Sequence, residues 1–149
     1  MDVSLSIVLP VHNAESSLRH DVHLLLELLP DITPQFEILI VDDASVDETE
    51  EIAHELARKY PQVHVTRHQH RRGQAAAVQT AVTRTAGEVV FVQDEGTKIR
   101  AAEIQRLWEM RHDQQLVTAR AEMPRKALHP HLLDQLASWG ERLRGAELT

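Results

Sequence analysis

The chain has 149 residues, with 16 basic and 23 acidic side chains, a formal net charge of −7 and no cysteine. This length suits one domain, and 42% hydrophobic with 26% charged residues is typical of a globular protein rather than a disordered one. The net charge argues against a general nucleic-acid binder, despite the basic segment 67–72, and the absence of cysteine excludes disulfides and thiolate metal sites. No apolar run is long enough for a membrane span and no signal peptide opens the chain, so a cytoplasmic location is expected.

The first predicted unit is a strand over residues 3–9 followed by a helix. Pro10 is expected to end the strand, because proline has no N–H to donate to a sheet. Residues 10–13 have turn chemistry, and the helix is expected from about Ala14. Its apolar residues recur at helical spacing: Leu18, Val22, Leu25 and Leu29.

A second strand is predicted over residues 36–41, and it ends in Asp42 and Asp43. The next helix is expected to begin with Asp47 as N-cap and Glu50 three residues later, a capping-box arrangement. Its apolar positions predict the buried side: Ile52, Ala53, Leu56 and Tyr60. A short third strand follows over residues 63–66, with the character of an edge strand.

The segment from Gly87 to Gly96 is the most informative part of the chain. It follows a predicted small-residue helix over residues 73–86, in which Ala77, Ala81 and Val82 can approach a sheet closely. Residues 88–92 read as a strand buried on both faces, and the carboxylates of Asp94 and Glu95 come directly after it. In open α/β sheets ligands bind beyond the carboxyl ends of such strands, so these acids are candidate ligand-binding residues.

Strands and helices alternate along the chain, which predicts a three-layer α/β/α domain with a mostly parallel sheet. After Glu95, a helix is expected around Ile104, Leu107, Trp108 and Arg111, then a fifth strand over residues 116–119. Residues 121–149 are expected to form a C-terminal helical segment, so that residues 1–149 make a single domain. The apolar stripe of this segment would need cover, either by folding back on its own sheet or, as we predict, from a second copy in a homodimer: Leu132, Leu133, Leu136, Trp139 and Leu143.

Three segments together resemble the nucleotide-sugar-binding half of a family-2 glycosyltransferase with the GT-A fold. They are Ser6-Ile-Val-Leu-Pro-Val-His-Asn-Ala-Glu15, Glu37-Ile-Leu-Ile-Val-Asp-Asp-Ala-Ser-Val-Asp47, and Arg72-Gly-Gln-Ala-Ala-Ala77 through Gly87–Val92. The ordered set covers about residues 4–120 and is closest to the polyprenyl-phosphate, dolichyl-phosphate mannose type of branch. The chain ends where family members continue, so the expected fold is a truncated one that keeps the donor half.

The resemblance implies a site for a nucleotide-diphosphate sugar. Asp43 matches the carboxylate that accepts a base N–H, and an Asp43→Ala variant should lose roughly 1.5–3 kcal/mol of nucleotide binding. Pro10, His12 and Glu15 match the loop that walls the base and ribose, with His12 in place of the usual Tyr. Arg67, Arg71 and Arg72 either contact the diphosphate or form a solvated loop; Arg72 and Asp94 complete the predicted nucleotide-binding set.

The resemblance also implies a metal. Gln93-Asp94-Glu95 aligns with the Asp-x-Asp motif that holds Mg²⁺ or Mn²⁺ against the pyrophosphate, so Asp94 and Glu95 are the candidate ligands. Gln93 brings no charge here, and Glu95 extends one methylene further than Asp. The histidines around His64, His68 and His70 lack ligand spacing and are expected at the surface.

Two functions are consistent with these residues. One is transfer of a hexose from the nucleotide sugar to a polyprenyl phosphate or saccharide, peripheral to a membrane where the acceptor is a lipid. The other is a catalytically degenerate module that binds nucleotide or a partner without turnover. The segment that would carry a catalytic base is missing, so no catalytic residue is assigned. A receiver domain, a dinucleotide-binding Rossmann domain and a P-loop do not fit residues 10–15.

Overall fold

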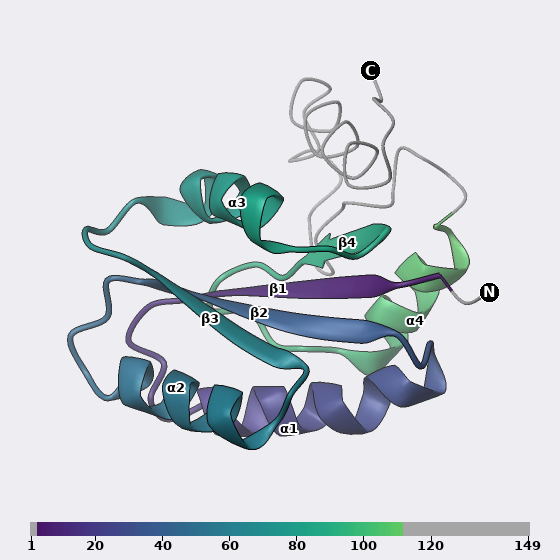
Figure 1. The fold of residues 1–149 in the computed structure, drawn as a ribbon, viewed down its shortest axis with the longest axis horizontal. Coiled ribbons are helices and arrows are strands. Elements are labelled where there is room, and N and C mark those ends of the chain that lie inside the picture. Colours follow the sequence, from purple (N-terminus) through teal and green to yellow (C-terminus); the bar gives the residue numbers. More distant parts are fainter. Residues whose placement is uncertain (1–2, 112–149) are drawn as a thin grey trace.

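The computed structural model describes residues 3–111, which form a parallel four-stranded sheet with helices on both faces (Figure 1). The strands are β1 (Leu5–Val11), β2 (Phe36–Asp43), β3 (Val63–His68) and β4 (Val89–Val92), in the order β3-β2-β1-β4. The helices are α1 (Leu18–Leu28), the 3₁₀ turn η1 (Leu29–Asp31), α2 (Thr49–Lys59), α3 (Gly73–Arg84) and α4 (Ala101–Glu109). The predicted α/β class and parallel sheet are confirmed, and β3 lies at an edge of this sheet.

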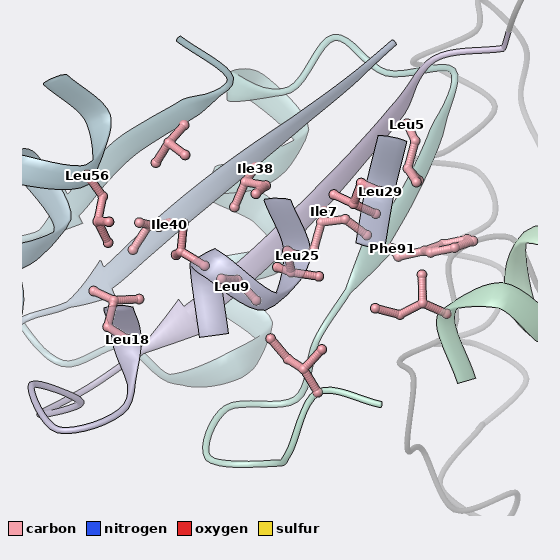
Figure 2. Close-up of a cluster of buried hydrophobic side chains, with 14 of the residues drawn as sticks. Leu5, Ile7, Leu9, Leu18, Leu25, Leu29, Ile38, Ile40, Leu56 and Phe91 are labelled. Atoms are coloured by element: carbon pink, nitrogen blue, oxygen red, sulfur yellow. The ribbon is translucent and has the colours of Figure 1, made fainter. Parts of the chain in front are cut away.

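Alternation along the strands divides the core into two layers. The larger layer joins one sheet face to α1, α2 and α4, and Figure 2 shows its side chains from β1, β2, β4, α1 and α2. Ile7, Ile38 and Phe91 belong to it, whereas the neighbouring Val8, Leu39 and Val90 point to the other face. Both faces are covered, which is why the strands read as continuous apolar runs.

The second layer is thin, because α3 covers it with small residues. Ala77 and Ala81 are fully buried against Val8, Val41, Val90 and Val92, as their spacing predicts. Figure 1 shows α3 on this face, opposite α1 and α2. The predicted three-layer arrangement is therefore confirmed.

The prediction that Pro10 ends the first strand is wrong: β1 continues to Val11. In a parallel strand alternate residues bond to opposite neighbours, and Val8 O accepts from Gln93 N on the β4 side. Pro10 is two residues after Val8, so its nitrogen also faces β4, but the β1–β4 pairing stops at Val8–Val92. The missing N–H of Pro10 therefore removes no hydrogen bond of the β1–β4 pairing. On its other side β1 stays paired with β2 as far as Val11.

Two helix starts also differ from prediction. Helix α1 begins at Leu18 rather than near Ala14, because the chain first makes a turn in which Ser17 N donates to Ala14 O. Helix α2 begins at Thr49, and the expected capping box between Asp47 and Glu50 does not form. The Asp47 carboxylate instead accepts from the N–H and hydroxyl of Thr49, two residues ahead.

The remaining predictions concern the carboxyl-terminal part of the chain. Helix α4 buries Ile104, Leu107 and Trp108 as expected, while Arg111 lies past its end with the guanidinium 4.4 Å from the Trp108 ring centroid. The predicted strand 116–119, the helical segment 121–149 and its dimer contact lie outside the described residues. Within residues 3–111, no helix combines the length and apolar character that crossing a membrane requires.

Candidate functional site

The carboxyl ends of β1, β2 and β4 meet at one edge of the sheet, because β1 lies between the other two. A cavity of about 600 Å³ opens there, within the usual range for small-molecule sites. Its walls come from the loop after β1, the first turns of α1 and the loop after β4. The lining residues are Leu9–Ala14, Ser16, Ser17, His20, Asp21, Leu24 and Gln93–Ile99.

The loop after β1 is fixed to the loop after β2 by hydrogen bonds in both directions. Asn13 N donates to Ser45 Oγ (2.8 Å), and the Asn13 side-chain oxygen accepts from Val46 N (2.9 Å). Ala14 N donates to Thr49 Oγ1 (2.7 Å). Because each loop supplies the other's polar partners, this wall of the cavity is held in place without a ligand.

His12 is held in a defined tautomer by the same wall. Its Nδ1 lies 2.8 Å from the carbonyl oxygen of Asp43, which can only accept, so Nδ1 carries the proton. Nε2 then accepts from the Asn13 amide at 3.2 Å. The ring is partly exposed and lines the cavity.

Asp42 is a structural carboxylate. Its side chain is fully buried, where Oδ1 accepts from Ser45 N (3.0 Å) and Oδ2 pairs with Arg67 Nη1 (2.6 Å). Arg67 also donates to Ser45 O (3.0 Å). Arg67, whose side chain is still 31% exposed, therefore clamps the turn after β2.

Asp43 is buried as well and anchors the start of α3. Its oxygens accept from Arg72 N (2.9 Å) and Gly73 N (2.8 Å), and Oδ1 lies 2.8 Å from His68 Nδ1. Burial by itself would raise the pKa of Asp43, but the bonds from His68 and the two amides outweigh it, so the net pKa is lowered. The carboxylate stays charged and takes the place of a helix cap for α3.

His68 extends this network into α3. Its Nε2 lies 2.6 Å from Thr80 Oγ1, so β2, β3 and α3 are joined through one imidazole. The expectation that His68 is a surface histidine is wrong, since it is buried, whereas His64 and His70 are exposed as predicted. The period-two alternation of β3 carries no sign of this, because the partner carboxylate is 25 residues away.

Gln93 holds the loop after β4 in shape. Its Nε2 donates to Lys98 O (3.3 Å) and to Thr97 Oγ1 (2.6 Å), while the Thr97 hydroxyl donates to Asp94 O (2.7 Å). Because the Lys98 carbonyl can only accept and the Thr97 proton is already donated, the amide nitrogen must face this turn. The amide therefore serves the loop itself.

Glu95 is paired with Arg71. The guanidinium lies 2.8 Å from Glu95 Oε2 and 3.7 Å from Asp43 Oδ2, so it bridges carboxylates at the ends of β2 and β4. Six oxygen ligands satisfy Mg²⁺, and similar hard donors suit Mn²⁺. Within residues 3–111 no three Asp, Glu, His or Cys residues group as a metal site. With Glu95 paired to a cation and Gln93 bringing no charge, Asp94 is the one remaining acid of the motif, so the donor set fits a divalent ion poorly.

The cavity also contains a carboxylate that the sequence did not single out. Asp21 lines it from α1, and burial raises the pKa of this carboxyl, against a smaller lowering by His20. The sequence shows that Asp21 lies three residues after the buried Leu18 on the same helix. This spacing does not tell whether the side chain lines a cavity or faces solvent.

The predicted site residues fall into two groups. Pro10, His12, Asp94 and Glu95 line the cavity together. Glu15, Asp43 and Arg72 do not belong to its lining. Glu15 Oε1 accepts from Glu48 N (3.0 Å) before α2, and Arg72 is exposed at the start of α3 with its N–H bonded to Asp43. The roles of all seven toward a nucleotide or metal stay predictions.

Comparison with known proteins agrees with this geometry. Residues 6–118 match the sequence profile described as Glycosyl transferase family 2. A dolichyl-phosphate beta-glucosyltransferase, ALG5A, of Trichomonas vaginalis is 32% identical over 97 residues. A dolichol-phosphate mannosyltransferase of Pyrococcus furiosus is 33% identical over 92 residues. Each match covers 62% of this chain, but only 30% and 25% of the respective relative.

Solved structures share the fold. The mannosyltransferase PcManGT from Pyrobaculum calidifontis, solved with GDP-Man and Mn²⁺, is 26% identical with a TM-score of 0.50, over 62% of this chain and 27% of that one. S. aureus TarS 1–349 in complex with UDP-GlcNAc is 22% identical with a TM-score of 0.55, over 74% and 32%. The chain thus spans about a third or less of these two relatives and two solved structures.

Proposed function

Since the chain belongs to glycosyl transferase family 2, we propose that it binds a nucleotide-diphosphate sugar in the cavity at the carboxyl edge of its sheet. The observation that carries the proposal is the cavity itself, which brings the loop after β1 and the acidic loop after β4 to one concave surface. The likeness to PcManGT, solved with GDP-Man, supports this choice of ligand. The base and ribose would lie against Pro10 and His12, and the diphosphate toward residues 94–98.

The reaction we propose for the whole protein is hexose transfer to a polyprenyl phosphate or saccharide. The bond from the sugar C1 to the diphosphate breaks, a bond from C1 to the acceptor oxygen forms, and the nucleoside diphosphate leaves with the bonding pair. The two relatives named for dolichyl phosphate support a lipid-phosphate acceptor, which would place the reaction at a membrane surface. The acceptor side and a general base are assigned to no described residue.

A second function has its own support, namely nucleotide binding without turnover. Glu95 is held by Arg71, and Gln93 replaces an acid and serves its own loop. Neither feature prevents a nucleotide from entering the cavity. Incubation with UDP- and GDP-sugars and a polyprenyl phosphate separates the two functions, because only the enzyme releases free nucleoside diphosphate in proportion to acceptor.

Calorimetric titration with UDP and with GDP, with and without Mn²⁺, tests the binding step. Ser17→Trp places an indole at the wall of the cavity, whereas Thr83→Trp places one on the exposed side of α3, across the sheet. We expect one of the two nucleotides to bind the parent and Thr83→Trp alike. Ser17→Trp should weaken that binding by about tenfold or more, because filling a site removes ligand contacts.

The outcome that contradicts the proposal is a parent that binds neither nucleotide in either buffer. Equal affinities for Ser17→Trp and the parent would instead place the nucleotide elsewhere. Thermal unfolding of both tryptophan variants checks that each one is folded, so that lost binding is not mistaken for lost structure.

A further inference from the structure

The cluster of Arg71, Glu95 and Asp43 joins the ends of β2 and β4 to the loop before α3. Arg71 lies just before α3, Glu95 just after β4, and Asp43 at the end of β2. Their side-chain exposures are 48%, 22% and 1%, so the guanidinium forms the open, cationic end of a bridge whose other end is buried. A cation therefore already lies beside the acidic loop that borders the cavity.

Asp43 interacts only weakly with the Arg71 guanidinium. Its two oxygens already take the amides of Arg72 and Gly73 and the imidazole of His68. The distance from Arg71 to Asp43 is 3.7 Å, too long for a direct hydrogen bond, whereas the distance to Glu95 is 2.8 Å. A guanidinium has five N–H donors in a planar fork, so the bond to Glu95 leaves donors for a ligand.

A divalent ion would have to compete with this arrangement. An ion at Glu95 would have to share this carboxylate with Arg71, and the guanidinium would then lie close to the ion and repel it. Gln93 can offer an ion only a neutral amide oxygen and no charge, so Asp94 is the one remaining carboxylate of the motif. The residues of this chain thus disfavour the metal that a pyrophosphate-binding site of this fold would otherwise use.

We propose that this chain binds a nucleoside diphosphate without a divalent cation, with the Arg71 guanidinium contacting the diphosphate oxygens while it keeps its bond to Glu95. This inference rests on the function proposed above. Charge-assisted bonds from a planar fork to phosphate oxygens are strong and directional, which suits a site that must replace ionic coordination. The side chains of Arg72, next to Arg71 in the sequence, and of Lys98, in the loop after β4, are exposed and add positive charge.

The test is calorimetric titration of the full chain with UDP and GDP, once in EDTA and once in Mn²⁺. The parent should bind one nucleotide with affinities that agree within about twofold in the two buffers, because no ion takes part in the complex. Arg71→Met should lose about tenfold or more, since a charge-assisted contact to phosphate disappears. Arg58→Met removes the same charge from the exposed last turn of α2 and should leave binding unchanged.

Arg71→Lys is a control for misfolding of Arg71→Met, because a lysine keeps the positive charge and can still pair with Glu95. It should bind more tightly than Arg71→Met yet more weakly than the parent, since it lacks the fork. Electron paramagnetic resonance of free Mn²⁺ supplies a second readout. We expect the parent with bound nucleotide to leave the free Mn²⁺ signal at the level that nucleotide alone gives.

Several results would overturn the inference. One is nucleotide binding to the parent that is at least about tenfold tighter in Mn²⁺ than in EDTA; another is uptake of one Mn²⁺ per chain. Unchanged binding by folded Arg71→Met would show that Arg71 does not contact the phosphates. Absence of binding in both buffers would be a different failure, because it removes the proposed function and this inference with it.

Discussion

At the scale of single residues, Asp43 illustrates how a carboxylate at a sheet edge can organise a site without facing it. Its carboxylate accepts hydrogen bonds from the amides of Arg72 and Gly73, where α3 begins, and from His68. Because Asp43 is buried, water cannot replace it as the acceptor for these donors. A substitution that removes the charge of Asp43 should therefore lower the free energy of unfolding, in addition to any effect on nucleotide binding.

We expect Asp43→Asn to lower the free energy of unfolding by about 1.5–3 kcal/mol at neutral pH, because bonds to a charged acceptor are lost and an amide N–H₂ then faces backbone donors. The exposed Asp31→Asn in η1 is the control and should change it little. Urea unfolding of the parent and both variants provides the measurement.

The pH dependence of that difference has a definite sign. The folded-state pKa of Asp43 is lowered, so its contribution is present above the ordinary Asp pKa of about 3.9 and is lost as the pH falls through the lower, folded-state value. The gap between parent and Asp43→Asn should accordingly shrink in acid. A gap that stays constant from neutral pH to strong acid would show that the charge is not its source.

Ala44 occupies a conformation that its side chain disfavours, with φ at +61° between Asp43 and Ser45. Ala44→Gly should stabilise the protein by several tenths of a kcal/mol to about 1 kcal/mol, because the left-handed penalty of about 1–2 kcal/mol exceeds the extra unfolded-state entropy of glycine. Ala75→Gly, at an exposed position within α3, should instead destabilise by about 1 kcal/mol. Equal effects of the two changes on the melting temperature would contradict this.

At the scale of elements, the spacing of apolar residues in the sequence predicted most of the helices and strands of the structure. Helix α1 buries Leu18, Val22 and Leu25 as its spacing predicts, and β4 is buried on both faces. The error at Pro10 arose because a missing N–H matters only on the side where a partner strand continues. That depends on the lengths of two strands together, which local sequence does not contain.

Gly87, just before β4, allows the backbone to pack closely against Ser6 of β1. A Cβ at Gly87 would lie 2.4 Å from Ser6 Oγ and 2.7 Å from Ser6 N, on β1. Gly87→Ala should cost roughly 1–3 kcal/mol, as overpacking does. Ser6→Ala should not rescue it, because the clash with the backbone nitrogen remains. Full rescue in the double variant, measured by denaturant unfolding, would show that the side chain alone sets this limit.

At the scale of the whole molecule, chain order was enough to bring several predicted residues to the edge of the sheet where the cavity lies. Pro10, His12, Asp94 and Glu95 line that cavity, and they were singled out because motif position and strand end nearly coincide. Glu15, Asp43 and Arg72 were placed by resemblance to the family, and the sequence could not show that each already has a structural partner. The Arg71–Glu95 bridge joins two loops across 24 residues, so its pairing follows only from the fold.

The central claim is that a nucleoside diphosphate binds at the carboxyl edge of the sheet, and residue-resolved NMR tests it most directly. Amide resonances are followed while UDP or GDP is added to the ¹⁵N-labelled chain. The account predicts that the largest shifts fall on residues 12–14 and 94–98, which line the larger cavity. Shifts confined to Ser4, Phe36 and Gly87, which line the cavity of about 250 Å³ at the opposite edge, would contradict it.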